Sequence, residues 1–305
     1  MTRPLSRALP YAAVASAAIS WGTWSLILRH VEAIAPMSSA LESAIVMAVL
    51  TGVTGLSSLR DRVASRAPLS ARMWIVWLGV ADALNVLLFF AAYKITIAVA
   101  SPLLLREGMT LRTALAVVGS FAGLAVMLGP GGAGVDSVAA WQSAALGAGS
   151  ALFYASNVIG NKFVAENFST SEVMFWHGTI ATPLLVVFVP RGEWAAVHAH
   201  AATFLALLSI GPGALAGLAF VWGLRRMPAA HASTLTLIEP LVAVVAGALV
   251  FGETLGTPAL AGGALILAGA LTVMTAKPGA IASAVSLHER GQVGPSDALR
   301  VEDDA

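Results

Sequence analysis

The 305-residue chain contains no cysteine and little charge. The absence of cysteine excludes thiol catalysis, thiolate metal ligation and disulfide bonds. Charged residues make up 11% of the sequence and hydrophobic residues 58%, whereas soluble globular domains carry about 25% charged residues. A soluble chain of this composition could not cover its surface with polar groups. The composition therefore predicts a protein that is surrounded by lipid.

The sequence also lacks the features of nucleic-acid-binding proteins and of common enzymes. The formal net charge is only +1 and no basic stripe is present, so we expect no nucleic-acid partner. There is no His-Glu-x-x-His motif, no Asp-x-x-Asp pair and no Gly-x-Ser-x-Gly elbow, which argues against an intramembrane enzyme. No phosphate-binding loop is present either. We therefore expect no metal, no cofactor and no ATP-driven transport.

Apolar segments long enough to cross a bilayer recur along almost the whole chain. A hydrocarbon core about 30 Å thick requires about 20 apolar residues per helix. Arg3 and Arg7 before the first apolar run could mark a secretory signal, but such a signal precedes a soluble body, and here the apolar segments continue. The predicted full spans are Tyr11–Leu28, Pro36–Leu56, Met73–Tyr93, Leu111–Gly129, Ser143–Phe163, Glu172–Val189, Ala202–Leu224, Ala230–Phe251 and Thr257–Ala276, with a short apolar piece at Ile95–Leu105.

The basic residues predict the orientation of these spans. With ten crossings and a cytoplasmic N-terminus, most lysines and arginines fall on the cytoplasmic side, and only Arg29, Lys94 and Arg191 fall outside, with two arginines left in the C-terminal tail. This asymmetry follows the positive-inside rule. The sequence therefore predicts a multi-pass protein of the inner (plasma) membrane whose N-terminus is cytoplasmic.

Two parts of the chain resemble each other weakly. Trp21–Trp24 matches Tyr154–Asn157 at an offset of 133 residues, and Phe90–Lys94 matches Trp222–Arg226 at an offset of 132. Five spans per copy is an odd number, so the second copy would be inserted upside down, as in many secondary transporters. We therefore predict an all-α integral membrane fold of two inverted repeats of five helices, residues 1–135 and 136–277. Residues 278–305 are predicted to form a disordered polar tail.

The two predicted repeats differ in length. Leu103–Glu107 matches Leu249–Glu253 at an offset of 146, so the first copy lacks 14 residues of its expected fourth helix. The remnant, Ile95–Leu105, would form about 16 Å of helix, which is half of a bilayer. Three interpretations stay open: nine full spans plus a short or re-entrant fourth helix, nine crossings with everything after Lys94 inverted, or a deletion that impairs the protein.

Several short motifs resemble those of one transporter family. They are Ser20-Trp21-Gly22 with Arg29 in the first half, and Ala229–Ser233, Leu237–Pro240 and Phe251–Glu253 leading into Gly262–Gly269 in the second. Over residues 10–276, the chain resembles the EamA-type branch of the drug/metabolite transporter superfamily. The resemblance implies ten helices in two inverted repeats and a central cavity lined by the first, third and fourth helices and their repeat-related partners. It also implies transport of small organic metabolites, in some cases by exchange or proton coupling.

Ionisable residues within apolar spans are costly and are therefore candidate functional residues. Asp82 lies near the middle of the third span and shares one helical face with Asn85, Phe89 and Tyr93, which follow at intervals of three or four residues. This stripe could face a cavity in which Asp82 binds an amine or carries a proton. Alternatively, a protonated Asp82 could be hydrogen-bonded between helices.

Glu239 is the second acidic candidate, because it directly precedes Pro240 within the ninth span. A proline removes a helix hydrogen bond, which a membrane helix tolerates beside a cavity or a partner group. Glu239 could therefore be a ligand or proton site in a cavity-lining segment. The alternative is a packing kink in which Glu239 pairs with a neighbour.

A third group consists of aromatic, amide and imidazole side chains. Trp21 and Trp24 occupy positions related by the repeat to Tyr154 and Asn157, and these side chains could line a path and stack on a planar solute, or simply pack and anchor. His231 at the inner mouth of the ninth span could gate or cap a helix. Glu42 and His177, also repeat-related, could pair. Gly211-Pro212-Gly213 should break or kink the eighth span.

The sequence therefore predicts a secondary transporter that moves small organic metabolites by alternating access, with proton coupling or exchange as candidate modes. The alternative is a degenerate, non-transporting membrane protein, because of the short fourth helix. The expected partners are a small-molecule solute and the lipid bilayer, and no oligomeric state is predicted. The predicted substrate- or proton-binding residues are Asp82, Glu239, Trp21, Asn85, Tyr93, Tyr154, Asn157 and His231.

Overall fold

Long helices make up the described part of the chain. The computed structural model describes residues 4–35, 37–58, 67–89, 111–127, 137–196, 199–252 and 255–275. Within these ranges the structure contains helices and no β-strand. Five helical runs there are long and apolar enough to cross a bilayer: Ala8–Ile34, Thr170–Phe188, Ala199–Leu224, Ala229–Phe251 and Thr257–Thr275. The prediction of an all-α, multi-pass membrane protein is confirmed.

Most helices follow the predicted spans within a few residues. The helices before residue 136 are α1 (Pro4–Gly22), α2 (Trp24–Ile34), α3 (Ser39–Ser58), α4 (Leu69–Phe89) and α6 (Leu111–Met127). Those after it are α7 (Ser137–Phe163), α8 (Thr170–Phe188), α9 (Glu193–Ala196), α10 (Ala199–Ser209), η2 (Ile210–Leu215), α11 (Ala216–Leu224), α12 (Ala229–Thr236), α13 (Ile238–Phe251) and α14 (Thr257–Thr275). The expected short fourth helix and the polar tail lie outside the described residues.

The first helical run is longer than its apolar stretch predicts. Instead of ending at Leu28, it continues as α2 to Ile34, after a single turn at Thr23 whose hydroxyl donates to the Ser20 carbonyl at 2.6 Å. In the extension, Arg29 and Glu32 are exposed whereas Val31 is buried. The extension is thus amphipathic, and a search for continuous apolar residues cannot find it.

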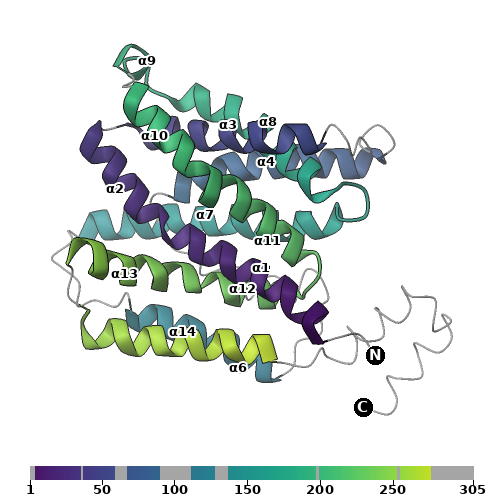
Figure 1. The fold of residues 1–305 in the computed structure, drawn as a ribbon, viewed down its shortest axis with the longest axis vertical. Helices are drawn as coiled ribbons and strands as arrows, with labels where there is room; N and C mark the ends of the chain where they lie inside the picture. The colour runs from purple at the N-terminus through teal and green to yellow at the C-terminus, as the bar shows by residue number, and fades with distance from the viewer. Residues whose placement is uncertain are drawn as a thin grey trace.

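Helices from the two halves of the chain pack against each other. α3 packs along α8, α6 along α14, α1 against α11 and α4 against α7. Figure 1 shows the α3–α8 and α6–α14 pairs on opposite sides of the bundle. The inverted repeat stays a prediction, and these pairings are compatible with a two-fold relation between the halves.

Glycines permit the closest of these helix–helix approaches. A Cβ at Gly178 of α8 would lie 2.6 Å from the Met47 carbonyl oxygen of α3. A Cβ at Gly123 of α6 would lie 2.7 Å from the Gly262 carbonyl oxygen of α14. Lipid tails are as apolar as the side chains, so close packing through small residues must supply much of the attraction between membrane helices. These two glycines therefore hold the halves of the bundle together.

Two membrane helices of the second half are interrupted. Gly211-Pro212-Gly213 lies in the π-helical turn η2 between α10 and α11, so the predicted disturbance of this helix is confirmed. The predicted ninth span is divided at Leu237 into α12 and α13. Pro240 has no N–H to donate to the carbonyl of Thr236 four residues earlier, and the break lies between these two residues. Glu239 consequently sits in the first turn of α13.

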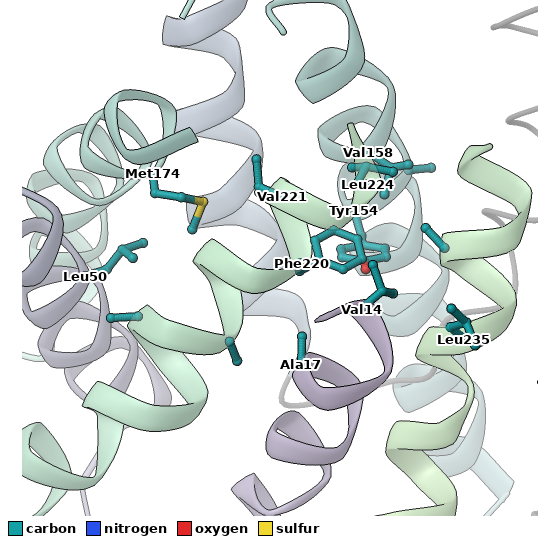
Figure 2. Close-up of a cluster of buried hydrophobic side chains, with 14 of the residues drawn as sticks. Val14, Ala17, Leu50, Tyr154, Val158, Met174, Phe220, Val221, Leu224 and Leu235 are labelled. Carbon is teal, nitrogen blue, oxygen red and sulfur yellow. The ribbon is translucent and has the colours of Figure 1, made fainter. Parts of the chain in front are cut away.

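The largest apolar core lies where the two halves meet. Figure 2 shows the ring of Phe220 beside that of Tyr154, and their centroids are 6.1 Å apart. Val14 lies next to these rings, which belong to the same buried cluster. Trp21 extends the aromatic group, since its ring centroid lies 5.1 Å from that of Phe220. This aromatic group forms part of the wall of the cavity described next.

Candidate functional site

A cavity of about 160 Å³ lies between the two halves of the chain. Side chains from α1, α2, α3 and α4 line it on one side, and side chains from α7, α8, η2, α11 and α13 line it on the other. The ionisable lining residues are Asp82, His177 and Glu239, and the aromatic ones are Trp21, Trp24, Tyr154 and Phe220. Within the described residues, no lysine or arginine lines this cavity.

Asp82 is held by hydrogen bonds to two neighbouring helices. Its Oδ1 accepts a hydrogen bond of 2.8 Å from Asn157 Nδ2 of α7, and its Oδ2 lies 2.8 Å from His177 Nδ1 of α8. The Asp82 side chain is 16% exposed, whereas that of His177 is 3% exposed. The carboxylate thus connects the imidazole and the amide while part of it remains accessible from the cavity.

The amides near Asp82 are also oriented by hydrogen bonds. Asn161 Nδ2 donates to the Asn157 carbonyl at 2.9 Å. On α4, the Asn85 Oδ1 lies 2.9 Å from the hydroxyl of Ser150 on α7. These hydrogen bonds fix the orientation of each amide group. The Asn85–Ser150 contact also joins α4 to α7.

Glu239 approaches the cavity from the broken helix. It is 8% exposed and lies in the first turn of α13. A Cβ at Gly22 of α1 would lie 2.7 Å from the Glu239 carbonyl oxygen. Only a residue without a side chain allows α1 to pack so closely on the backbone of Glu239. This close approach explains why the Ser20-Trp21-Gly22 motif has glycine at position 22.

Six of the eight predicted site residues line the cavity: Trp21, Asp82, Asn85, Tyr154, Asn157 and Glu239. Tyr93 lies outside the described residues. His231 is not among the lining residues. It is buried on α12, where its Nδ1 lies 2.7 Å from the Tyr11 hydroxyl, so it joins α12 to α1 instead of facing the cavity.

His177 lines the cavity although its predicted partner was different. The repeat suggested a pair between His177 and Glu42, but the imidazole contacts Asp82 instead. Glu42 is buried on α3 and is not among the lining residues. Repeat-related residues occupy equivalent places in the two copies, and equivalence does not bring two side chains into contact. The predicted pairing was therefore wrong.

Asn161 and Phe220 are further lining residues that the sequence did not reveal as site residues. Asn161 follows Asn157 by one helical turn in an otherwise apolar stretch, so the four-residue spacing of two buried amides was the available signal. Phe220 lies in the apolar helix α11 and carries no polar group. Nothing in its sequence surroundings separates it from a core residue.

Basic side chains gather at the end of the bundle where α7 and α11 finish. Lys162 donates to the Met227 carbonyl, and Arg225 Nη1 donates to the Phe168 carbonyl at 2.8 Å. Burial and, second, the neighbouring Arg226 lower the pKa of Arg225 to about 10. The guanidinium therefore stays protonated at neutral pH, and this end of the bundle is positively charged.

The sequence of the second half is similar to a known transporter family. Residues 141–275 match the model of the EamA-like transporter family. The match covers less than half of the chain. The resemblance carried by the sequence motifs is thereby confirmed, and the family segment contains Tyr154, Asn157, His177 and Glu239 of the cavity wall.

Two known proteins extend this comparison. A protein of Archaeoglobus fulgidus named an uncharacterized transporter is 32% identical over 126 residues, which are 40% of this chain. The chain covers 44% of the length of that relative. A crystal structure described simply as that of a protein has a TM-score of 0.69 at 17% identity, covering 88% of this chain and 99% of the other. At this identity the likeness shows a shared fold alone.

Proposed function

We propose that this chain is a secondary transporter that moves a small organic solute through the cavity by alternating access. The observation that carries the proposal is the position of two carboxylates, Asp82 and Glu239, in one cavity between the two halves. Ionisable groups within membrane helices are expensive and usually mark substrate or ion pathways. The match of residues 141–275 to the EamA-like transporter family and the name of the archaeal relative support transport over catalysis.

Asp82 and His177 are the proposed site of proton coupling. Carboxylates and imidazoles within membrane helices are typical of proton pathways. Asp82 is the member of the pair with the more accessible side chain. A solute that contacts this carboxylate would therefore compete with a proton for it, which would couple the two fluxes.

The interrupted helices are the proposed moving parts. The π-helical turn η2 contributes Pro212 and Gly213 to the cavity wall, and the helix broken at Leu237 contributes Glu239. Transporter sites are typically built from such discontinuous helices, and one part of the protein rocks against the other around the site. Both interruptions lie in helices that touch the cavity, where a small rotation would change its shape.

We further propose that the chain lies in the inner membrane with its N-terminus in the cytoplasm. The end of the bundle that carries Lys162, Arg225 and Arg226 is positively charged, and the positive-inside rule places such an end in the cytoplasm. α1 contacts both α11 and α12, and its Tyr11 reaches His231 beside this end. The N-terminal part of α1 would accordingly be cytoplasmic.

A non-transporting membrane protein is the second candidate function. The specific observation in its favour is the 14-residue difference between the two copies, which falls on a helix expected to line the cavity. If this difference abolishes transport, the chain would keep only packing or assembly roles.

Solute flux in proteoliposomes tests the proposal. Amino acids, amines and nucleobases would be offered under an imposed pH gradient to the wild-type protein, to Asp82→Asn and to Glu42→Gln, a buried acid that does not line the cavity. We expect flux in the wild type and in Glu42→Gln, and its loss in Asp82→Asn. If flux appears only after 14 residues are inserted between Ala100 and Ser101, the natural chain is instead a non-transporting membrane protein.

A further inference from the structure

The charged groups of the cavity wall are mostly acidic. Asp82 and Glu239 are two carboxylates in a space of about 160 Å³, and His177 is the one ionisable base among the described lining residues. Carboxylates removed from water are stable only beside compensating positive charge or hydrogen-bond donors. An anionic solute would add repulsion to this wall, whereas a cation would be attracted to it.

The hydrogen bonds around Asp82 determine which atoms of the wall stay unused. Asn157 must turn its Nδ2 to the Asp82 carboxylate, and Asn161 turns its Nδ2 to the Asn157 carbonyl. Their Oδ1 atoms, which can only accept hydrogen bonds, have no donor within the described part of the chain. Both oxygens have almost no accessible surface, toward the cavity or toward bulk water, so they are closed to a solute in this conformation.

His177 carries a third buried polar atom of this kind. Its Nδ1 faces Asp82, and its Nε2 has no partner among the described residues. The polar part of the cavity wall thus combines two carboxylates with one imidazole.

Several buried hydroxyl groups donate within their own helix, whereas those of Ser43, Ser120 and Thr179 have no partner among the described residues. Thr54 donates to the Leu50 carbonyl, Ser209 to that of Leu205 and Thr234 to that of Ala230, each one helical turn earlier. Helices can satisfy small hydroxyls internally in this way, but they cannot supply donors to side-chain carbonyls. Buried polar atoms without a partner thus occur at several places in the described part of the bundle, and the partly exposed carboxylate of Asp82 is the acceptor that a solute in the cavity can reach.

Aromatic rings cover the apolar part of the same cavity. Trp21 and Tyr154 both lie against Phe220, and all three line the space. Faces of tryptophan and tyrosine rings attract a cation, most strongly where water is excluded, and they also stack on planar apolar groups. One wall thus suits an ammonium group and the other suits the hydrocarbon body attached to it.

We infer that the solute is an organic cation with a protonated primary or secondary amine and a compact, partly aromatic body. The amine donates to the Asp82 carboxylate, and the body lies on Trp21, Tyr154 and Phe220. Quaternary ammonium compounds carry the charge but no N–H donor, so they bind less well than amines of the same size. This inference concerns the site of the proposed transport function and rests on it.

Calorimetric titration of the purified full-length protein in detergent tests this inference with a matched set of probes. Phenethylamine, 2-phenylethanol and phenylacetate share one body and differ in charge, and N,N,N-trimethylphenethylammonium keeps the charge without the donors. We expect phenethylamine to bind about tenfold or more tightly than each of the others, because a charge-assisted contact in a dry site contributes at least this factor. Equal or tighter binding of the alcohol or the anion would overturn the inference, and equal binding of the quaternary ion would overturn its donor part.

Variants locate the bound amine. Asp82→Asn and Glu239→Gln each keep the shape of the side chain and remove one charge, and Asp82→Asn should weaken phenethylamine binding about tenfold or more. Glu42→Gln replaces a buried carboxyl group outside the cavity wall and should leave binding unchanged. Thermal unfolding of each variant identifies loss of fold. If Asp82→Asn does not fold, Glu239→Gln serves as the test, and it should bind phenethylamine no more tightly than 2-phenylethanol. If neither variant changes phenethylamine binding, the amine does not bind at this site and the inference is contradicted.

The transport proposal and this inference fail in different ways. Phenethylamine that binds through Asp82 but is not moved across the membrane would contradict transport and keep the cation site. Flux of neutral or anionic solutes with no binding of phenethylamine would keep transport and contradict the cation site.

Discussion

Asp82 of α4 and His177 of α8 share a hydrogen bond of 2.8 Å between Oδ2 and Nδ1. The two residues belong to different halves of the chain and both line the cavity between those halves. Asn157 of α7 holds the other carboxylate oxygen. A change in charge or position at Asp82 is therefore transmitted directly to two helices of the second half, which is the arrangement that coupling between a site and a conformational change requires.

Replacing His177 tests how far Asp82 depends on this contact. His177→Ala removes the partner of Asp82 Oδ2 inside the protein, and a buried polar group left without its partner costs about 1–3 kcal/mol. We expect a fall of this size in the unfolding free energy, measured by denaturant titration in detergent. His177→Gln, whose amide keeps a donor, should lose less. His200→Ala, at an exposed position, is the control, and the same stability for all variants would show that the contact contributes nothing.

Glycine packing between α3 and α8 gives a second prediction. At Gly178→Ala the new methyl group would lie 2.6 Å from the Met47 carbonyl oxygen, which forces the helices apart and costs about 1–3 kcal/mol. Gly52→Ala changes the partner helix, where no atom lies within 4 Å of the added group, and gains up to about 1 kcal/mol of helix propensity. We expect opposite shifts in the thermal unfolding temperature. Equal shifts would mean that α3 and α8 do not approach as described.

The membrane topology can be tested without a background signal because the chain has no cysteine. With ten crossings, a cysteine introduced by Asp136→Cys should react with a membrane-impermeant reagent added outside cells. The Pro278→Cys variant should react only after the cells are permeabilised. Reaction of position 278 in intact cells would establish nine crossings and reverse the orientation of everything after Lys94.

The helical architecture was largely predictable from the sequence because a bilayer imposes the length of each span. α14, for example, begins at Thr257 as predicted and ends one residue before the predicted Ala276. The exceptions have local causes. α2 continues to Ile34 through amphipathic turns that are not continuously apolar, and the ninth span breaks at Leu237 because Pro240 withholds the hydrogen bond to the preceding turn.

The sequence predicted which residues line the cavity better than it predicted which of their side chains are in contact. Asp82 and Glu239 stood out because each carries charge in an apolar segment, and Trp21, Tyr154 and Asn157 because the repeat relates their positions. His177 lies 95 residues from Asp82, and one sequence contains no signal for contact over such a separation. Helix packing determines which side chains meet, so the partner of His177 and the inclusion of Phe220 required the structure.

Blocking the cavity is the most direct test that solute passes through it. Val46 lines the cavity from α3, whereas Ala48, two residues further along the same helix, is exposed on the surface of the bundle. Val46→Cys and Ala48→Cys would each be reacted with a small methanethiosulfonate reagent and checked for complete modification by mass spectrometry. Flux of a solute that the wild-type protein carries would then be measured in proteoliposomes. The account predicts that modification at position 46 abolishes flux, that excess solute protects this position, and that modification at position 48 has no effect; full flux after complete modification at position 46 would contradict it.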